Sequence, residues 1–194
     1  MLATKASFEF FKNKLAVLSF FFFAYVVVYF ASKQFGFANA IKTPEGIIFL
    51  PAGVRLLACL VGRSWGAIGI IIASWMVVGP DVFENQSQDF YFTLALIHTI
   101  PVLFSIFFAQ KKIFKISEDL SNLKLIHLPF IDLMATFSQA FFYYSFLYLV
   151  KIIDKSNLLP WFISQVTGNF LGGMFFMFAL MLILQISNRA AHMN

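Results

Sequence analysis

The sequence predicts an all-α fold: a polytopic membrane protein with about six transmembrane helices in one domain over residues 1–194. Hydrophobic residues make up 60% of the chain and charged residues only 12%, whereas a soluble domain is usually about 45–50% apolar and about 25% charged. A soluble fold of this length cannot bury so many apolar side chains, because much of a small globule stays exposed to water. These residues also form runs of about 20, the length that crosses a bilayer.

Six apolar segments mark the predicted helices. The first follows three lysines, and its length favours an uncleaved membrane anchor over a signal peptide, whose apolar core is shorter. The segments cover about 15–32, 46–62, 65–80, 90–109, 128–150 and 161–186.

The second and third segments form a predicted helical hairpin, because they are short, nearly continuous and joined by Gly62-Arg63-Ser64. Pro51 lies within the second segment and predicts a kink there. Gly79-Pro80 predicts the end of the third helix.

The distribution of Lys and Arg predicts that both termini face the cytoplasm, because short cytoplasmic loops carry an excess of these residues. The connection 80–89 has three acids and no base, which suits the outer side. The longest cytoplasmic loop, about 110–127, is expected to form a short amphipathic helix, a docking segment or simple surface contact. The inner side then holds Lys5, Lys12, Lys14, Arg63, Lys111, Lys112, Lys115, Lys124 and Arg189, and the outer side holds Lys33, Lys42, Lys151 and Lys155.

Arg55 places a charge in the middle of the second apolar segment. Such a charge costs at least about 2.5–3.5 kcal/mol on insertion, so it is expected to face the protein interior and to be paired. Asp132 is the acid that lies within an apolar segment away from its end, at a depth within a few ångströms of Arg55 at 1.5 Å per residue. We predict an Arg55–Asp132 pair, either as a structural clamp or with Arg55 holding a ligand carboxylate or phosphate.

Polar side chains from four segments are predicted to point toward one another. In the fifth segment, Asp132, Gln139 and their polar neighbours share one helical face, and His98 lies mid-membrane in the fourth. The arrangement indicates either a polar-lined pocket or a structural hydrogen-bond network. The predicted site or network consists of Arg55, Asp132, His98, Gln139, Gln165 and Asn169.

Small residues predict close contacts between helices. Spaced four apart on one helix, they allow backbones to approach. The predicted packing residues are Gly53, Gly62, Gly66, Gly69, Ser164, Gly168 and Gly172.

The residues give little support for catalysis, so we predict no enzyme activity, no cofactor and no metal site. Metal sites need clustered His, Cys or carboxylates, and the membrane segments offer only His98 and Asp132. Cys59 has no second cysteine to pair with. The net charge of +5 lies in short stretches beside apolar runs, which predicts contact with anionic lipid and no nucleic-acid partner.

Two stretches resemble a known family. Residues 50–70, LPAGVRLLACLVGRSWGAIGI, combine a Pro-Ala-Gly turn, an apolar helix and a second helix opened by Gly62, Trp65 and Gly66. This pattern resembles MASE1-type membrane sensor domains, and 161–182 resembles their last helix. The helix outline is also loosely similar to the substrate-binding subunits of energy-coupling-factor vitamin transporters. MASE1-type sensors are usually fused to cyclase, kinase or phosphodiesterase domains, so the resemblance implies that a partner supplies the output.

These observations predict a ligand-binding or sensory module in the plasma membrane, here the bacterial inner membrane. Its expected partners are the bilayer, a membrane or signalling protein and a small anionic ligand. Two alternatives stay open: a substrate-binding-type transporter subunit, and an accessory or structural subunit of a larger membrane complex.

Overall fold

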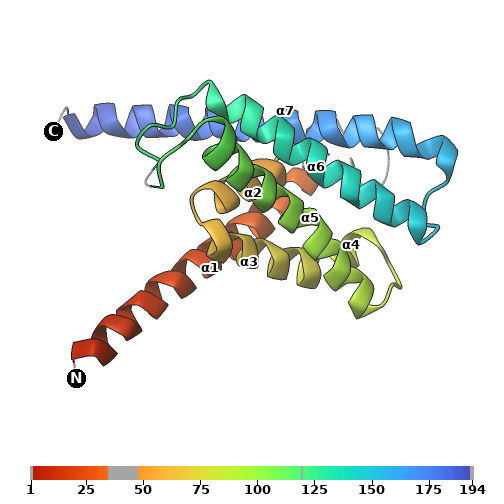
Figure 1. Cartoon of the computed structure of the whole chain (residues 1–194), viewed down its shortest axis with the longest axis horizontal. Helices are drawn as coiled ribbons and strands as arrows, with labels where there is room; N and C mark the ends of the chain where they lie inside the picture. The colour runs from red at the N-terminus through yellow and green to blue at the C-terminus, as the bar shows by residue number, and fades with distance from the viewer. Residues whose placement is uncertain (1, 35–47, 119, 193–194) are drawn as a thin grey trace.

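The computed structural model of the chain describes residues 2–34, 48–118 and 120–192, with side chains between positions 13 and 179 of those ranges. Every regular element in the described part is a helix, which confirms the predicted all-helical class. Figure 1 shows α7 running along one side of the bundle with α6 beside it, α5 packed on α6, and the N-terminal end of α1 projecting away from the other helices.

Four of the described helices are long and apolar enough to cross a membrane. They lie at Asn13–Gln34 within α1 (Leu2–Gln34), at Arg63–Val82, at Gln88–Ile113 and at Lys155–Ala179 within α7 (Lys155–His192). Both α1 and α7 extend beyond the predicted apolar segments, because their polar flanking residues continue the helix. Pro160 lies in the second turn of α7, where its missing N–H leaves the carbonyl of Ser156 without its helical donor.

Helix α2 (Pro51–Leu60) has only ten residues, a length of about 15 Å. It is therefore shorter than the predicted segment 46–62, of which residues 46 and 47 lie outside the described part of the chain. Pro51 occupies the first turn of this helix instead of kinking its interior, a position where proline lacks only an N–H that would be unpaired anyway. Nine of its ten residues are buried, so α2 lies at the centre of the fold.

The third predicted helix is continuous but irregular. It comprises α3 (Arg63–Ala73), the π-helical segment η2 (Ser74–Val78) and α4 (Gly79–Val82). The prediction that Gly79-Pro80 ends it is wrong by two residues. In η2 the N–H of Gly79 bonds to the carbonyl of Ser74, and this shifted register accommodates Pro80 at the start of α4.

The remaining helices agree closely with the predicted segments. Ser87 caps α5 (Gln88–Phe108) by accepting a hydrogen bond from the N–H of Phe90, and η3 (Ala109–Ile113) continues it as a π-helix. Helix α6 covers His127–Leu149. Between 114 and 126 the described residues form turns instead of the amphipathic helix that was one expectation for this loop.

The predicted small residues lie where helices touch. A side chain on Gly66 would overlap the backbone of Ala58, one on Gly62 would overlap the Phe21 ring, and one on Gly69 would lie 2.5 Å from the carbonyl oxygen of Leu18. Helix α3 is thereby held against both α2 and α1.

A second group of small residues holds α7 against the segment that leads into α2. A side chain on Gly172 would overlap the backbone of Phe49, and the carbonyl of Gly168 accepts a hydrogen bond from the Phe49 N–H at 2.9 Å. A side chain on Gly53 would likewise overlap the side chain of Phe176. Ser164 is half-buried on α7.

Candidate functional site

The candidate site is centred on Arg55, which α2 carries into the core. The residue is 2% exposed, and its Nη1 atom lies 3.0 Å from Nδ1 and 2.8 Å from Nε2 of His98 on α5. Guanidinium groups only donate hydrogen bonds, so the His98 ring accepts through whichever nitrogen carries no proton. The two residues form a buried pair that contains a positive charge and no carboxylate.

The predicted ion pair between Arg55 and Asp132 is wrong as a direct contact. The two charges are close enough to act on each other, but Oδ2 of Asp132 is buried without a hydrogen-bond partner in the described part of the chain. The Thr136 hydroxyl donates to Oδ1 at 3.5 Å. His98 lies against the guanidinium, while the Asp132 carboxylate packs against Gly173 of α7, where any side chain would displace it.

A separate amide cluster joins α6 to α7. Gln139 accepts a hydrogen bond from Nδ2 of Asn169 at 2.8 Å and one from Nε2 of Gln165 at 3.3 Å. All three side chains are buried. These contacts are those of a structural network between two neighbouring helices. The six predicted residues are thus divided between the Arg55–His98 pair, Asp132, and this amide cluster.

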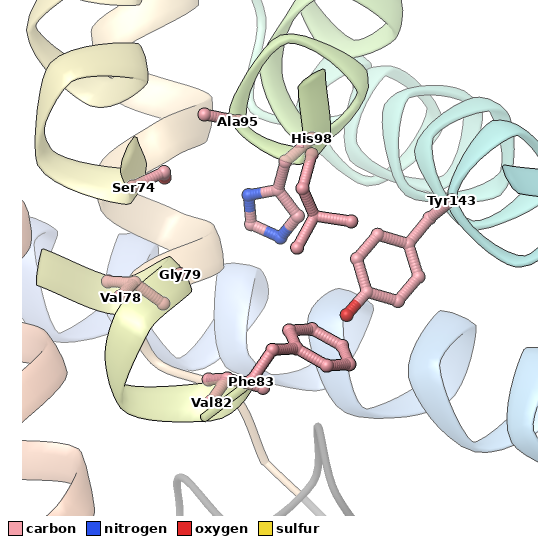
Figure 2. Close-up of a pocket in the computed structure, with 9 residues that line it drawn as sticks. Ser74, Val78, Gly79, Val82, Phe83, Ala95, His98 and Tyr143 are labelled. Atoms are coloured by element: carbon pink, nitrogen blue, oxygen red, sulfur yellow. The ribbon is translucent and has the colours of Figure 1, made fainter. Parts of the chain in front are cut away.

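A small cavity lies against the His98 ring. Figure 2 shows His98 from α5 and Tyr143 from α6 pointing into it, with Ser74 of η2 on one side and Phe83 opposite. The ring centroids of His98 and Tyr143 are 6.0 Å apart. The cavity volume is about 30 Å³, enough for about two water molecules and far below the roughly 300–1,000 Å³ of a drug-sized ligand site.

Several buried polar atoms of the bundle, two of them in the amide cluster, have no hydrogen-bond partner among the described residues. Such atoms are rare in native structures, and a bound water or ion is one of the explanations for them. The set includes residues that the sequence reasoning did not select, although each is a polar residue within an apolar run. They are Tyr25 Oη, Ser74 Oγ, Trp75 Nε1, Thr99 Oγ1, Asp132 Oδ2, Gln139 Nε2 and Gln165 Oε1.

A scan of family models, a search of curated proteins and a search of solved structures found no match to this chain. The described residues contain no group of three His, Cys, Asp or Glu side chains placed to hold a metal ion.

Proposed function

We propose that the chain is an integral membrane ligand-binding or sensory module that recognises a small anionic group at Arg55. The observation that carries this proposal is the buried guanidinium, which contacts the ring of His98 and has no carboxylate directly paired with it among the described residues. A buried charge is costly when it lacks a partner. An anionic group in contact with Arg55 would supply the missing negative charge and would satisfy polar atoms that are otherwise unpaired.

The short helix α2 supports a binding role. The chain enters it from Phe49, which is pinned to Gly168 in the middle of the apolar part of α7. Half-length helices that begin inside the membrane hold ions and substrates in several transporter folds. This feature favours the substrate-binding-type transporter subunit as the nearest alternative within the same proposal.

The small cavity limits the ligand. His98 lines this cavity and Arg55 does not, so an anion in it would contact the guanidinium only where the His98 side chain gives way. About 30 Å³ beside His98 fits a group the size of about two water molecules. A ligand with a larger body would require α5 and η2 to separate.

The proposed topology has about six membrane segments, with both termini in the cytoplasm of a bacterial plasma membrane. Two sets of ion pairs support it. Lys33 and Asp81, both assigned to the outer side, lie 2.7 Å apart. Arg63 and Lys111, both assigned to the inner side, lie 3.7 and 4.0 Å from Glu118.

The proposal includes a separate partner protein, which the resemblance to MASE1-type sensors implies. The resemblance to MASE1-type sensors remains a prediction that suggests signalling as the output.

An accessory or structural subunit is the second candidate. The observation that favours it is the small volume of the cavity, since a core without room for a ligand needs its polar groups only to fix the helices. In that case Arg55 and His98 would stabilise the fold, and the function would belong to a complex.

Unfolding of the purified protein in detergent, with formate (an anion close to this size) added at constant ionic strength, tests the two candidates. A ligand at ten times its Kd raises the free energy of unfolding by about 1.4 kcal/mol. We expect this increase in the wild-type protein and in Lys124→Met, which removes an exposed cation, and no increase in Arg55→Met. Equal responses of the wild type and Arg55→Met would contradict anion binding at Arg55.

A further inference from the structure

A second, larger cavity lies at the end of the bundle where the α2–α3 turn meets α5. Its volume is about 440 Å³, within the range of sites for small molecules. Cys59 and Arg63 form one side, α5 from Ile100 to Phe107 forms another, and the segment Ile116–Glu118 lies over the end. We call this cavity the inner groove, after the side to which the proposed topology assigns it.

The long wall of the inner groove is apolar and open. Ile100, Phe104 and Phe107 lie on one face of α5 and are 50%, 68% and 52% exposed. Their spacing of four and three residues puts them in a row along the helix. Because α5 belongs to a span that can cross a membrane, this row borders hydrocarbon and is suited to an acyl chain.

The end of the inner groove is cationic. Arg63 and Lys111 share one carboxylate, that of Glu118, at 3.7 and 4.0 Å. The side chains of Arg63 and Glu118 are 51% and 77% exposed, and long, exposed ion pairs of this kind contribute little stability. The Arg63 guanidinium also donates to the backbone carbonyl of Glu118. The two cations Arg63 and Lys111 are therefore paired with a single carboxylate, that of Glu118, through contacts that contribute little stability.

The apolar wall reaches this cationic end directly. Nζ of Lys111 lies 4.6 Å from the centre of the Phe107 ring. A molecule that follows the row of aromatic residues thus brings its polar end to Lys111 and Arg63. This arrangement matches an amphiphile with a negative head group and an extended hydrocarbon tail.

We propose that the inner groove binds one anionic membrane phospholipid. Its phosphate pairs with Arg63 and Lys111 in place of the Glu118 carboxylate, and one acyl chain lies along Ile100, Phe104 and Phe107. Arginine and lysine are the usual partners of phosphate, and basic residues near the cytoplasmic surface attract anionic lipids. A zwitterionic lipid binds less tightly, because its own cation meets the same two basic residues. This inference rests on the proposed topology, which puts the groove at the cytoplasmic surface, and not on the proposed anion site at Arg55.

Native mass spectrometry of delipidated protein in detergent tests the proposal, with titration by phosphatidylglycerol and by phosphatidylcholine of the same chain length. We expect one phosphatidylglycerol to bind preferentially. Lys111→Gln should weaken its binding about fivefold, the value of roughly one basic residue at a membrane surface. Glu118→Gln should strengthen it, because the competing carboxylate is gone. Lys124→Gln, outside the groove, should change nothing.

Arg63→Gln is a weaker test, because the Arg63 side chain also holds the loop through its hydrogen bond to the Glu118 carbonyl. Lys111→Gln and Glu118→Gln together keep the test independent of that position. Equal binding of the two lipids overturns the proposal. So does a loss of binding in Lys124→Gln as large as in Lys111→Gln, or a Glu118→Gln variant that binds phosphatidylglycerol no better than the wild type.

Discussion

Arg55 and His98 hold a positive charge inside the bundle through a side-chain contact between α2 and α5. A hydrogen bond to a charged group contributes about 1.5–3 kcal/mol. The acid in the neighbouring part of the core, Asp132, acts on Arg55 from a distance and does not share this hydrogen bond. The two possible partners of Arg55 can therefore be ranked by experiment.

Double-mutant cycles of Arg55→Met with His98→Leu and with Asp132→Leu make that comparison. We expect a coupling free energy of about 1–3 kcal/mol between Arg55 and His98, and a smaller one between Arg55 and Asp132. Chemical unfolding in detergent measures both. A larger coupling with Asp132 would show that the two charges form the principal pair.

At the residue scale, sequence reasoning identified which polar side chains lie inside. Arg55, His98, Asp132, Gln139, Gln165 and Asn169 are all buried. It did not identify which of these side chains contact one another, because Arg55 was paired with Asp132 only on their similar depth in the membrane. The rotation of α2 and α6 about their axes decides the contact, and the small Gly173 that receives Asp132 carries no polar signal.

At the element scale, close backbone contact holds the α2–α3 hairpin together. Gly66→Ala should destabilise the protein by about 1–3 kcal/mol, the usual result of overpacking, because its new methyl group overlaps the rigid backbone of Ala58. Gly79→Ala is the matched control. Its nearest neighbours lie 3.1 and 3.2 Å away, so thermal unfolding should show a smaller effect. Equal effects of the two substitutions would argue against close packing at Gly66.

A second contact between elements fastens the end of α1 to α4. The Tyr29 hydroxyl donates to Asp81 at 2.5 Å, and Nζ of Lys33 lies 2.7 and 2.9 Å from the two oxygens of the same carboxylate. Tyr29→Phe should lower the free energy of unfolding by about 1–2 kcal/mol. Tyr148→Phe, at an exposed position, should lower it by less. If both variants unfold like the wild type, the contact does not stabilise the attachment of α1.

The sequence predicts the presence of each helix better than the residues at which the helix begins and ends. An apolar run marks the part of a helix that lies in the apolar environment. The two ends of α6 are therefore each within one residue of the predicted segment. Polar flanks that continue a helix, as in α7, have no such pattern. The register change in η2, where the Gly79 N–H bonds to the carbonyl of Ser74, has no signal in the apolar run. Helix α2 is short because residues 48 and 49, which lead into it, are not helical.

At the scale of the whole molecule, the proposed orientation in the bilayer rests on charge asymmetry and is directly measurable. In a Cys59→Ala background, Gln86→Cys and Leu125→Cys place single exposed thiols on opposite sides of the proposed topology. A membrane-impermeant maleimide added to intact cells should label position 86 and not position 125. Labelling of 125 alone would reverse the orientation, and labelling of both would contradict the proposed segment order.

The central claim is that Arg55 forms an anion site in the membrane core, and native mass spectrometry of the protein purified in mild detergent tests it most directly. We predict a retained small anionic molecule on the wild-type chain and on Lys124→Met, and its loss on Arg55→Met. A wild-type chain that carries a constant set of protein subunits and no small molecule would contradict this account, and would assign Arg55 to the architecture of a complex.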